Sequence, residues 1–218
     1  MHLKKRQMRQ NESGWTLVEI AIVIGIIGAL LAITIKGTGL LDSARIDNLM
    51  AISKDLSEGS RAFKEKYKFW PGDLPFAAND IQNIPAACNL DPTAAPATTG
   101  TGRIDTDTEV GCAIDDLVAT GLIKAEPDPA NAGRFILRSN YGPITIRSAT
   151  YSSVTNYPAT TLIAQFANLP CDIATNLDRQ IDDGDIASTS NGRAKSSVAN
   201  CVKDGANDPV PFFAIAIN

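Results

Sequence analysis

The chain has 218 residues, a net charge of −4 and one histidine, His2. Its basic residues gather at the N-terminus and leave the remainder acidic, which argues against nucleic-acid binding, because that function needs a basic surface. If residues 1–14 are removed, as argued below, no histidine remains, and sites built on histidine, from catalytic triads to His-containing zinc sites, are excluded. The length fits one helical segment and one head of about 150 residues.

The segment 15–35 is a run of 21 residues with a single charge, Glu19. At 1.5 Å per residue it would span about 31 Å, close to the thickness of a bilayer core. The preceding Lys4, Lys5, Arg6 and Arg9 place the N-terminus in the cytoplasm by the positive-inside rule. We therefore predict a transmembrane segment over 15–35, with the head on the other side of the membrane. A carboxylate inside such a helix is costly, so Glu19 is expected to have a partner.

The helix is predicted to continue past the apolar run, because no proline occurs between Trp15 and Trp70. Beyond Lys36, apolar residues recur with a period near 3.5, as expected for an amphipathic helix. They are Ile46, Leu49, Met50, Ile52, Leu56, Phe63 and Tyr67. We predict one long helix over residues 15–68, whose outer half hides this stripe against the head.

The head is predicted to occupy residues 69–218 and to begin with the turn Pro71-Gly72-Asp73. Short helices are expected at 115–123, capped by Asp115, and at 171–183, stopped by Gly184. Strands are expected at 134–138, 143–150, 160–167 and 210–217. The predicted fold class is α+β: a long N-terminal helix, with a membrane half and an amphipathic half, packed on a small antiparallel sheet.

Four cysteines lie far apart and form no zinc-type spacing: Cys88, Cys112, Cys171 and Cys201. An even number in an exported domain favours two disulfides, for which three pairings are possible. We favour Cys88–Cys112 and Cys171–Cys201, because each closes a polar, turn-rich loop. The alternative is four unpaired thiols in a cytoplasmic protein.

Acidic residues cluster at the end of the second short helix: Asp178, Asp182, Asp183 and Asp185. Carboxylates this close could bind calcium, although the run matches no EF-hand loop. We favour a solvated acidic helix end, and we interpret the second group, Asp105, Asp107 and Glu109, in the same way. No cofactor is predicted, with calcium at the four aspartates as the alternative.

The sequence from Gly14 to Glu19, GWTLVE, resembles the cleavage signal of type IV pilins and of type II secretion pseudopilins. That pattern has a hydrophilic leader, a glycine before the cut, an aromatic residue (usually Phe, here Trp15), and Glu as the fifth mature residue. The resemblance implies cleavage between Gly14 and Trp15 by a prepilin peptidase, possible N-methylation of Trp15, and a pilin-like fold.

In an assembled filament, the resemblance implies that Glu19 of one subunit faces the Trp15 amine of its neighbour. A buried carboxylate is tolerable when paired and strongly destabilising when alone, so pairing would also fix the register of the subunits. The partners implied are other copies of the chain, the peptidase, an inner-membrane assembly platform and membrane lipid before assembly. The implied location is the inner membrane first, then an extracellular or periplasmic filament.

Parts of the head resemble a set of pilin-like proteins that share the segment "PGD-x-P" after the long helix. Pro71-Gly72-Asp73-Leu74-Pro75 matches it, and residues 102–123 resemble the block "G-x-I … E … L-x-x-A-G-L-I". Asp182-Asp183-Gly184 is similar to an "I-D-D-G" turn of the same set, with Gly192 after it. These matches indicate the type of head and not which machine it serves.

The leading hypothesis is a structural, non-enzymatic subunit of a type IV pilus-like filament. The second is a type II secretion pseudopilin, which shares the whole N-terminal pattern. The third, from a different class, is a periplasmic enzyme with an uncleaved membrane anchor. It would need clustered nucleophile and base residues in the head, and the sequence offers no such cluster.

Overall fold

In the computed structural model of the chain, the structure describes residues 15–93, 99–187 and 191–217, without the side chains of residues 32–40. The chain divides into two compact units, Met1–Ser43 and Ala44–Asn218. The helices and 3-10 turns are α1 (Leu17–Tyr67), η1 (Ala77–Asn79), η2 (Ala86–Cys88), α2 (Asp107–Ala119), η3 (Ala149–Tyr151) and α3 (Cys171–Ile181). The strands are β1 (Glu126–Pro127), β2 (Phe135–Arg138), β3 (Pro143–Ser148), β4 (Leu162–Leu169), β5 (Ala194–Ser196) and β6 (Val210–Ala216).

Helix α1 has 51 residues, close to the predicted range 15–68. It ends where Lys68 adopts a left-handed conformation with φ of 69°, while the backbone N–H of Lys68 still donates to the carbonyl of Lys64 at 2.8 Å. Such a left-handed residue is a common way to end a helix, and Pro71 shortly after it prevents continuation. The prediction that the chain stays helical up to the proline-containing turn is confirmed.

The membrane half of the predicted fold class is wrong. In the part of the chain that the structure describes, no helix is long and apolar enough to cross a membrane. The corrected fold class is α+β, with a long helix and a six-stranded antiparallel sheet, and without the membrane half.

The outer part of α1 packs on the head along one stripe. Ile46, Leu49, Leu56 and Phe63 are at most 4% exposed and join the main core, as the periodicity predicted. Met50, Ile52 and Tyr67 are only partly buried at the edge of this stripe. Ser53 and Ser60 are also buried and complete the spacing of three and four residues.

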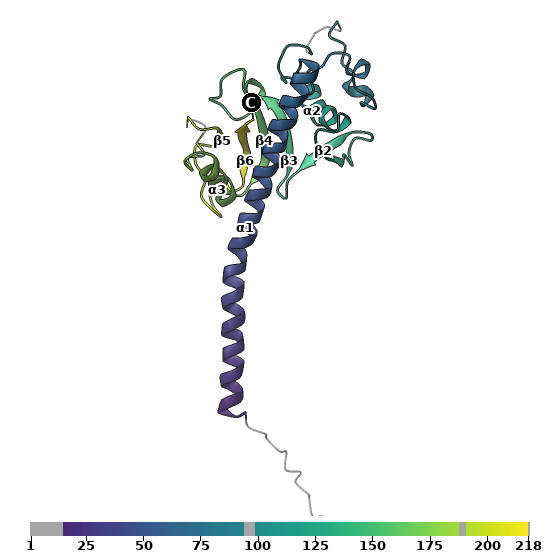
Figure 1. The fold of residues 1–218 in the computed structure, drawn as a ribbon. Coiled ribbons are helices and arrows are strands. Elements are labelled where there is room, and N and C mark those ends of the chain that lie inside the picture. The colour runs from purple at the N-terminus through teal and green to yellow at the C-terminus, as the bar shows by residue number, and fades with distance from the viewer. Residues whose placement is uncertain (1–14, 94–98, 188–190, 218) are drawn as a thin grey trace, which may run out of the picture. The chain divides into compact units, whose positions relative to one another are not determined.

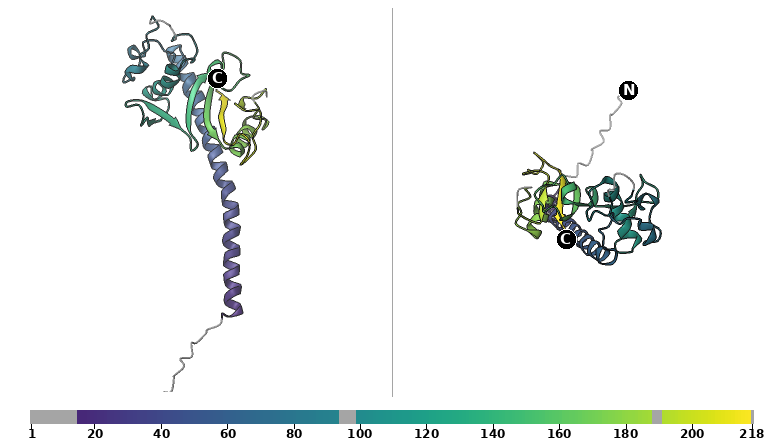
Figure 2. Two further views of the ribbon diagram at one scale, coloured as in Figure 1. Left: turned by 180° about the vertical axis from the view of Figure 1, so that it is seen from behind. Right: turned by 90° about the horizontal axis from the view of Figure 1, so that it is seen from above.

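The six strands form one antiparallel sheet in the order β1-β2-β3-β4-β6-β5. Figure 1 shows the outer part of α1, from Ala44 onwards, crossing one face of this sheet, with α2 and β2 to one side and α3 and β5 to the other. Seen from behind, in the left panel of Figure 2, the sheet lies in front of α1. Successive side chains of β4 point to opposite faces of the sheet. Leu162, Ala164 and Phe166 therefore join the core under α1, whereas Ile163 joins a smaller cluster.

The four strands predicted from the sequence are found as β2, β3, β4 and β6, with small differences at their ends. The short strands β1 and β5 were not predicted. Both are edge strands of two and three residues, and strands this short carry no alternation that a sequence pattern could reveal.

Helix α2 begins at Asp107, eight residues before the predicted start at Asp115, so the prediction that Asp115 caps this helix is wrong. The cap is Thr106, whose side chain accepts from the N–H of Glu109, while the Glu109 carboxylate accepts from the N–H of Thr106. This reciprocal capping box satisfies two backbone donors that would otherwise have no partner. Helix α3 begins at Cys171 as predicted and buries Ile173 and Leu177.

Candidate functional site

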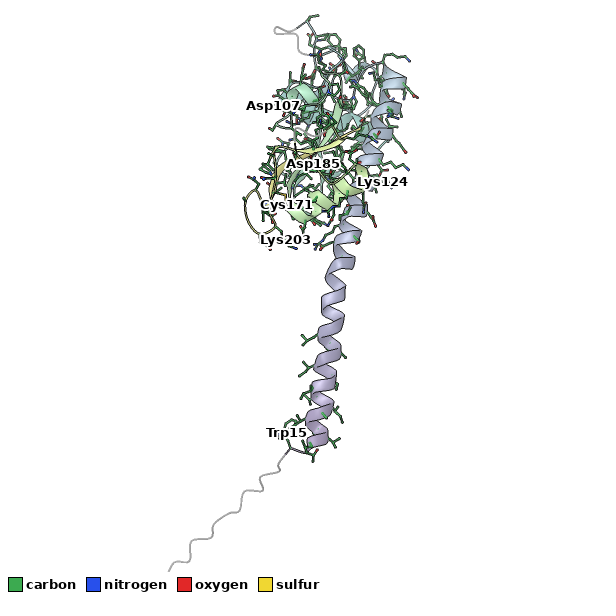
Figure 3. All side chains as sticks on the ribbon, turned by 90° about the vertical axis from the view of Figure 1, so that its left-hand side faces the viewer. Trp15, Asp107, Lys124, Cys171, Asp185 and Lys203 are labelled. Atoms are coloured by element: carbon green, nitrogen blue, oxygen red, sulfur yellow. A yellow bond between two sulfur atoms is a disulfide. The ribbon has the colours of Figure 1, made fainter. Side chains whose placement is uncertain are left out.

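The first candidate site is the N-terminal part of α1, where apolar side chains are exposed. Figure 3 shows these side chains projecting outwards along the helix from Trp15. Trp15 is 73% exposed and Leu17 is 87% exposed. The other large apolar side chains of this segment are exposed as well, namely Val18, Ile20, Ile22, Val23, Ile24, Ile26, Ile27, Leu30 and Leu31. A contiguous apolar surface of this kind is typical of a segment that binds another partner.

Glu19 is the single charged residue in this apolar segment, and it lies in the first turn of α1. Its Oε2 accepts from the backbone N–H of Thr16 at 2.8 Å and from the Thr16 hydroxyl at 3.0 Å. The Glu19 N–H donates to the Thr16 hydroxyl oxygen at 3.2 Å. Thr16 and Glu19 therefore form a capping box at the start of α1.

The sequence reasoning missed this capping box, although the spacing Thr16-x-x-Glu19 was its signal. Within one chain, Glu19 thus already has hydrogen-bond donors. Pairing of Glu19 with the Trp15 amine of a neighbouring copy stays a prediction. So does cleavage before Trp15 and its methylation, because Gly14 lies outside the described residues.

Both predicted disulfides are confirmed. Cys88 and Cys112 join η2 to α2, with Cα atoms 5.4 Å apart. Cys171 and Cys201 join the start of α3 to the loop before β6, with Cα atoms 5.7 Å apart. Disulfides form and persist in oxidising compartments, so the two bonds indicate a location outside the cytoplasm.

The four aspartates of the calcium alternative lie at the end of α3 and in the turn that follows. Asp182 accepts from the N–H of Ala194 at 2.7 Å, Asp183 accepts from that of Asp185 at 2.9 Å, and Asp185 accepts from that of Ala187 at 3.1 Å. Asp178 is fully buried. Burial raises the pKa of Asp178 to about 6, and its three acidic neighbours add to the rise, whereas the backbone N–H of Gly184 opposes it.

These aspartates do not converge on one point. Among the described residues, one group of three potential metal ligands has its ligand atoms within 4.8 Å of one another, namely Cys88, Cys112 and Asp115. The two sulfur atoms of that group are joined in a disulfide and offer no thiolate to a metal. Calcium binding at the end of α3 therefore stays a prediction, and the described carboxylates there form no converging set of ligands.

The second candidate site is a group of buried carboxylates between the turn after α1 and helix α2. Asp73 is fully buried, and its Oδ1 and Oδ2 accept from the N–H groups of Thr101 at 2.9 Å and Gly102 at 2.8 Å. Glu109, also fully buried, uses Oε2 for the N–H groups of Asp105 and Thr106. The residues that resemble the pilin-like head motifs thus lie together in space.

Two further carboxylates of α2 continue this group. Asp116 is 1% exposed and accepts from the N–H of Gly72 at 2.6 Å. Asp115 accepts from Arg134 Nε at 2.6 Å and from the N–H of Phe135 at 2.7 Å, which ties α2 to β2. Burial raises the pKa of Asp116 to about 7, and the adjacent Asp115 adds to the rise.

The prediction that Asp105, Asp107 and Glu109 form a solvated acidic group is wrong for Glu109, which is buried. Asp107 is exposed and accepts from the Tyr151 hydroxyl at 2.9 Å. The spacing Thr106-x-x-Glu109 was a signal that could have predicted this, because the glutamate of a capping box accepts a hydrogen bond from the backbone N–H of the cap residue.

The geometry thus comprises an exposed apolar helix end and a head closed by two disulfides and several buried carboxylates. Family membership stays a prediction that rests on the residues 14–19 and on the head motifs. Comparisons with models of known protein families, with curated proteins and with solved structures find no match for this chain.

Proposed function

We propose that this chain is a structural subunit of a type IV pilus-like filament, assembled through the N-terminal part of α1. The observation that carries the proposal is the exposed apolar surface over residues 17–31, with Glu19 as its single charge. Burying one large aliphatic side chain contributes about 1.5–3 kcal/mol, so helices that pack together here would gain a large driving force. Neighbouring copies of the chain are the occupants proposed for this surface.

The proposed assembly places Glu19 beside the new N-terminal amine of a neighbouring Trp15 after a prepilin peptidase has cut before Trp15. A carboxylate that leaves water in a helical bundle needs such a cation, because an unpaired buried charge costs about 3–5 kcal/mol. The two disulfides agree with a filament outside the cytoplasm, which an assembly platform of the cell would extend.

The test separates the charge of Glu19 from its role in the capping box. Glu19→Gln removes the charge but keeps an acceptor suited to a capping box, whereas Thr16→Val disrupts the box but keeps the charge. We expect filaments, imaged by electron microscopy of cells, to be lost in Glu19→Gln and retained in Thr16→Val. Head folding, followed by circular dichroism, should be unchanged in both variants.

Normal filaments with Glu19→Gln would overturn the proposed charge pairing. Mass spectrometry of the native protein provides an independent check, because cleavage predicts a chain that begins at Trp15. A chain that retains Met1 would contradict the filament proposal as a whole. Loss of exported enzymes without loss of fibres, on gene deletion, would indicate a secretion pseudopilus instead.

A further inference from the structure

The turn after α1 and the first turn of α2 bring two carboxyl groups together in the interior of the head. Asp73 and Glu109 are both fully buried, and the Glu109 carboxyl group lies within hydrogen-bonding reach of Asp73. Asp73 uses both of its oxygens for backbone N–H groups, those of Thr101 and Gly102. Oε2 of Glu109 likewise accepts from the backbone N–H groups of Asp105 and Thr106.

The remaining oxygen, Glu109 Oε1, has no N–H or O–H donor among the described residues. Two ionised carboxylates cannot share a buried contact, since each would repel the other in a medium of low dielectric constant. A proton on Glu109 Oε1 removes this conflict, because the neutral carboxyl group then donates to Asp73. Asp73, with two N–H donors, is the better place for the negative charge.

The geometry points to a proton-dependent latch, in which one proton shared by Asp73 and Glu109 holds the turn after α1 against α2 and opens when that proton is lost. The latch fixes the segment before α2 as well, because Asp73 binds the backbone of Thr101 and Gly102. It does not depend on the proposed function, since every group involved lies in the unit Ala44–Asn218.

The surroundings of the pair favour the protonated state. Burial raises the pKa of Glu109 to about 7, and the negative charges of Asp73 and Asp105 act in the same direction, whereas the N–H group of Asp105 and the side chain of Thr106 oppose it. Further charged or titratable groups contact α2 at other positions. Arg134, directly before β2, pairs with Asp115, Tyr151 from η3 bonds to Asp107, and Asp116 binds Gly72.

The direction of the pH dependence follows from the difference between the two states. The unfolded chain releases the proton of Glu109 near its ordinary pKa of 4.5, whereas the folded chain holds it up to about 7. The stabilisation from this proton is therefore complete below about pH 4.5 and is lost as the pH rises to about 7. Above that pH, Asp73 and Glu109 both carry charge, and the latch opens.

The experiment uses the full chain and measures hydrogen exchange at the amides of Thr101 and Gly102, corrected for the intrinsic pH dependence of exchange. In the wild type, protection of both amides should fall roughly tenfold between pH 6 and pH 8. In Glu109→Gln, whose amide donates to Asp73 at every pH, protection should stay constant over this range. Glu126→Gln, at an exposed carboxylate, is the matched control and should behave like the wild type.

The pKa of Asp116 is also raised to about 7. Asp116→Asn is therefore compared with Glu109→Gln, to decide which of the two carboxyl groups causes the pH-dependent loss of amide protection. Loss of protection in Glu109→Gln equal to that in the wild type would overturn the latch. If Glu109→Gln does not fold, the carbon-13 shift of the Glu109 carboxyl group in the wild type decides. A midpoint near 7 supports the latch, and a midpoint near 4.5 rejects it.

Discussion

At Gly72 the backbone has a φ of +88°, and a Cβ atom there would lie 2.2 Å from the carbonyl oxygen of Glu109. Either condition alone favours glycine, because side chains are strained at positive φ and because a contact this short must displace the backbone of α2. The neighbouring residues add to the constraint, since Pro71 prevents the helix from continuing and Asp73 binds two backbone N–H groups. Each residue of Pro71-Gly72-Asp73 thus has a separate physical role.

Gly72→Ala should destabilise the head by at least about 3 kcal/mol, from backbone strain plus the clash with α2. Gly133→Ala is the matched control, because Gly133 has a φ of +80° but nothing within 4 Å of an added Cβ. It should cost only about 1 to 2 kcal/mol, the strain alone. Denaturant unfolding of both variants measures the difference. Equal losses in the free energy of unfolding would show that the close contact between Gly72 and the Glu109 carbonyl adds nothing to the cost of the substitution.

The acidic residues of α2 show where sequence patterns stop being informative. Asp115 was predicted to cap a short helix, but it lies in the middle of α2 and binds Arg134 and Phe135. Its partners are 19 and 20 residues away, at the start of β2 and directly before it, so no local spacing could identify them. Glu109 was within reach of prediction, because its partner Thr106 lies three residues before it.

Elements with a strong period were predicted best. The stripe of α1 follows from a repeat near 3.5 residues, and four strands follow from their apolar composition. The start of α1 was predicted within two residues, but the prediction of a membrane half was wrong, because no helix among the described residues is long and apolar enough to cross a membrane. Both disulfides were predicted, because each of the favoured pairs closes a polar, turn-rich loop.

Helix α3 depends on contacts from the loop that Cys201 anchors. Asp208 in this loop accepts from the N–H of Cys171 at 2.9 Å and so caps α3, because Pro170 provides no side-chain cap. Replacing Cys171 and Cys201 by serine should cost about 3.5 kcal/mol on the loop-entropy model, in which cross-linking restricts the unfolded chain. Guanidinium unfolding of the variant against the oxidised wild type measures this loss.

The control for that measurement is Lys203→Ala, which breaks an ion pair between Lys203 of the same loop and Asp172 of α3. The Lys203 side chain is 63% exposed, and such pairs contribute at most about 1 kcal/mol. A disulfide variant no less stable than Lys203→Ala would contradict the stabilising role of the bond.

On the scale of the whole molecule, the chain separates into a part that forms a core and a part that does not. The buried apolar residues of α1 begin at Ile46, just after the boundary between the units at Ser43 and Ala44. The described apolar side chains before that boundary are exposed and join no core cluster. The head therefore has a complete interior of its own, in which the outer part of α1 is an integral element.

A chain that begins at Ala44 should accordingly fold without residues 1–43, unfold cooperatively and sediment as a monomer. A chain that begins at Gly59 is the matched comparison, because it lacks Ile46, Leu49 and Leu56 and exposes the sheet face that they cover. Removing a large buried aliphatic side chain costs about 2–5 kcal/mol, and three such losses approach or exceed the 5–15 kcal/mol that stabilises a typical domain. The shorter chain should thus show no cooperative thermal transition by near-ultraviolet circular dichroism. If both chains unfold with equally sharp transitions, α1 is not part of the head core. If the chain from Ala44 self-associates as strongly as the full chain, the apolar surface of residues 17–31 is not the assembly surface.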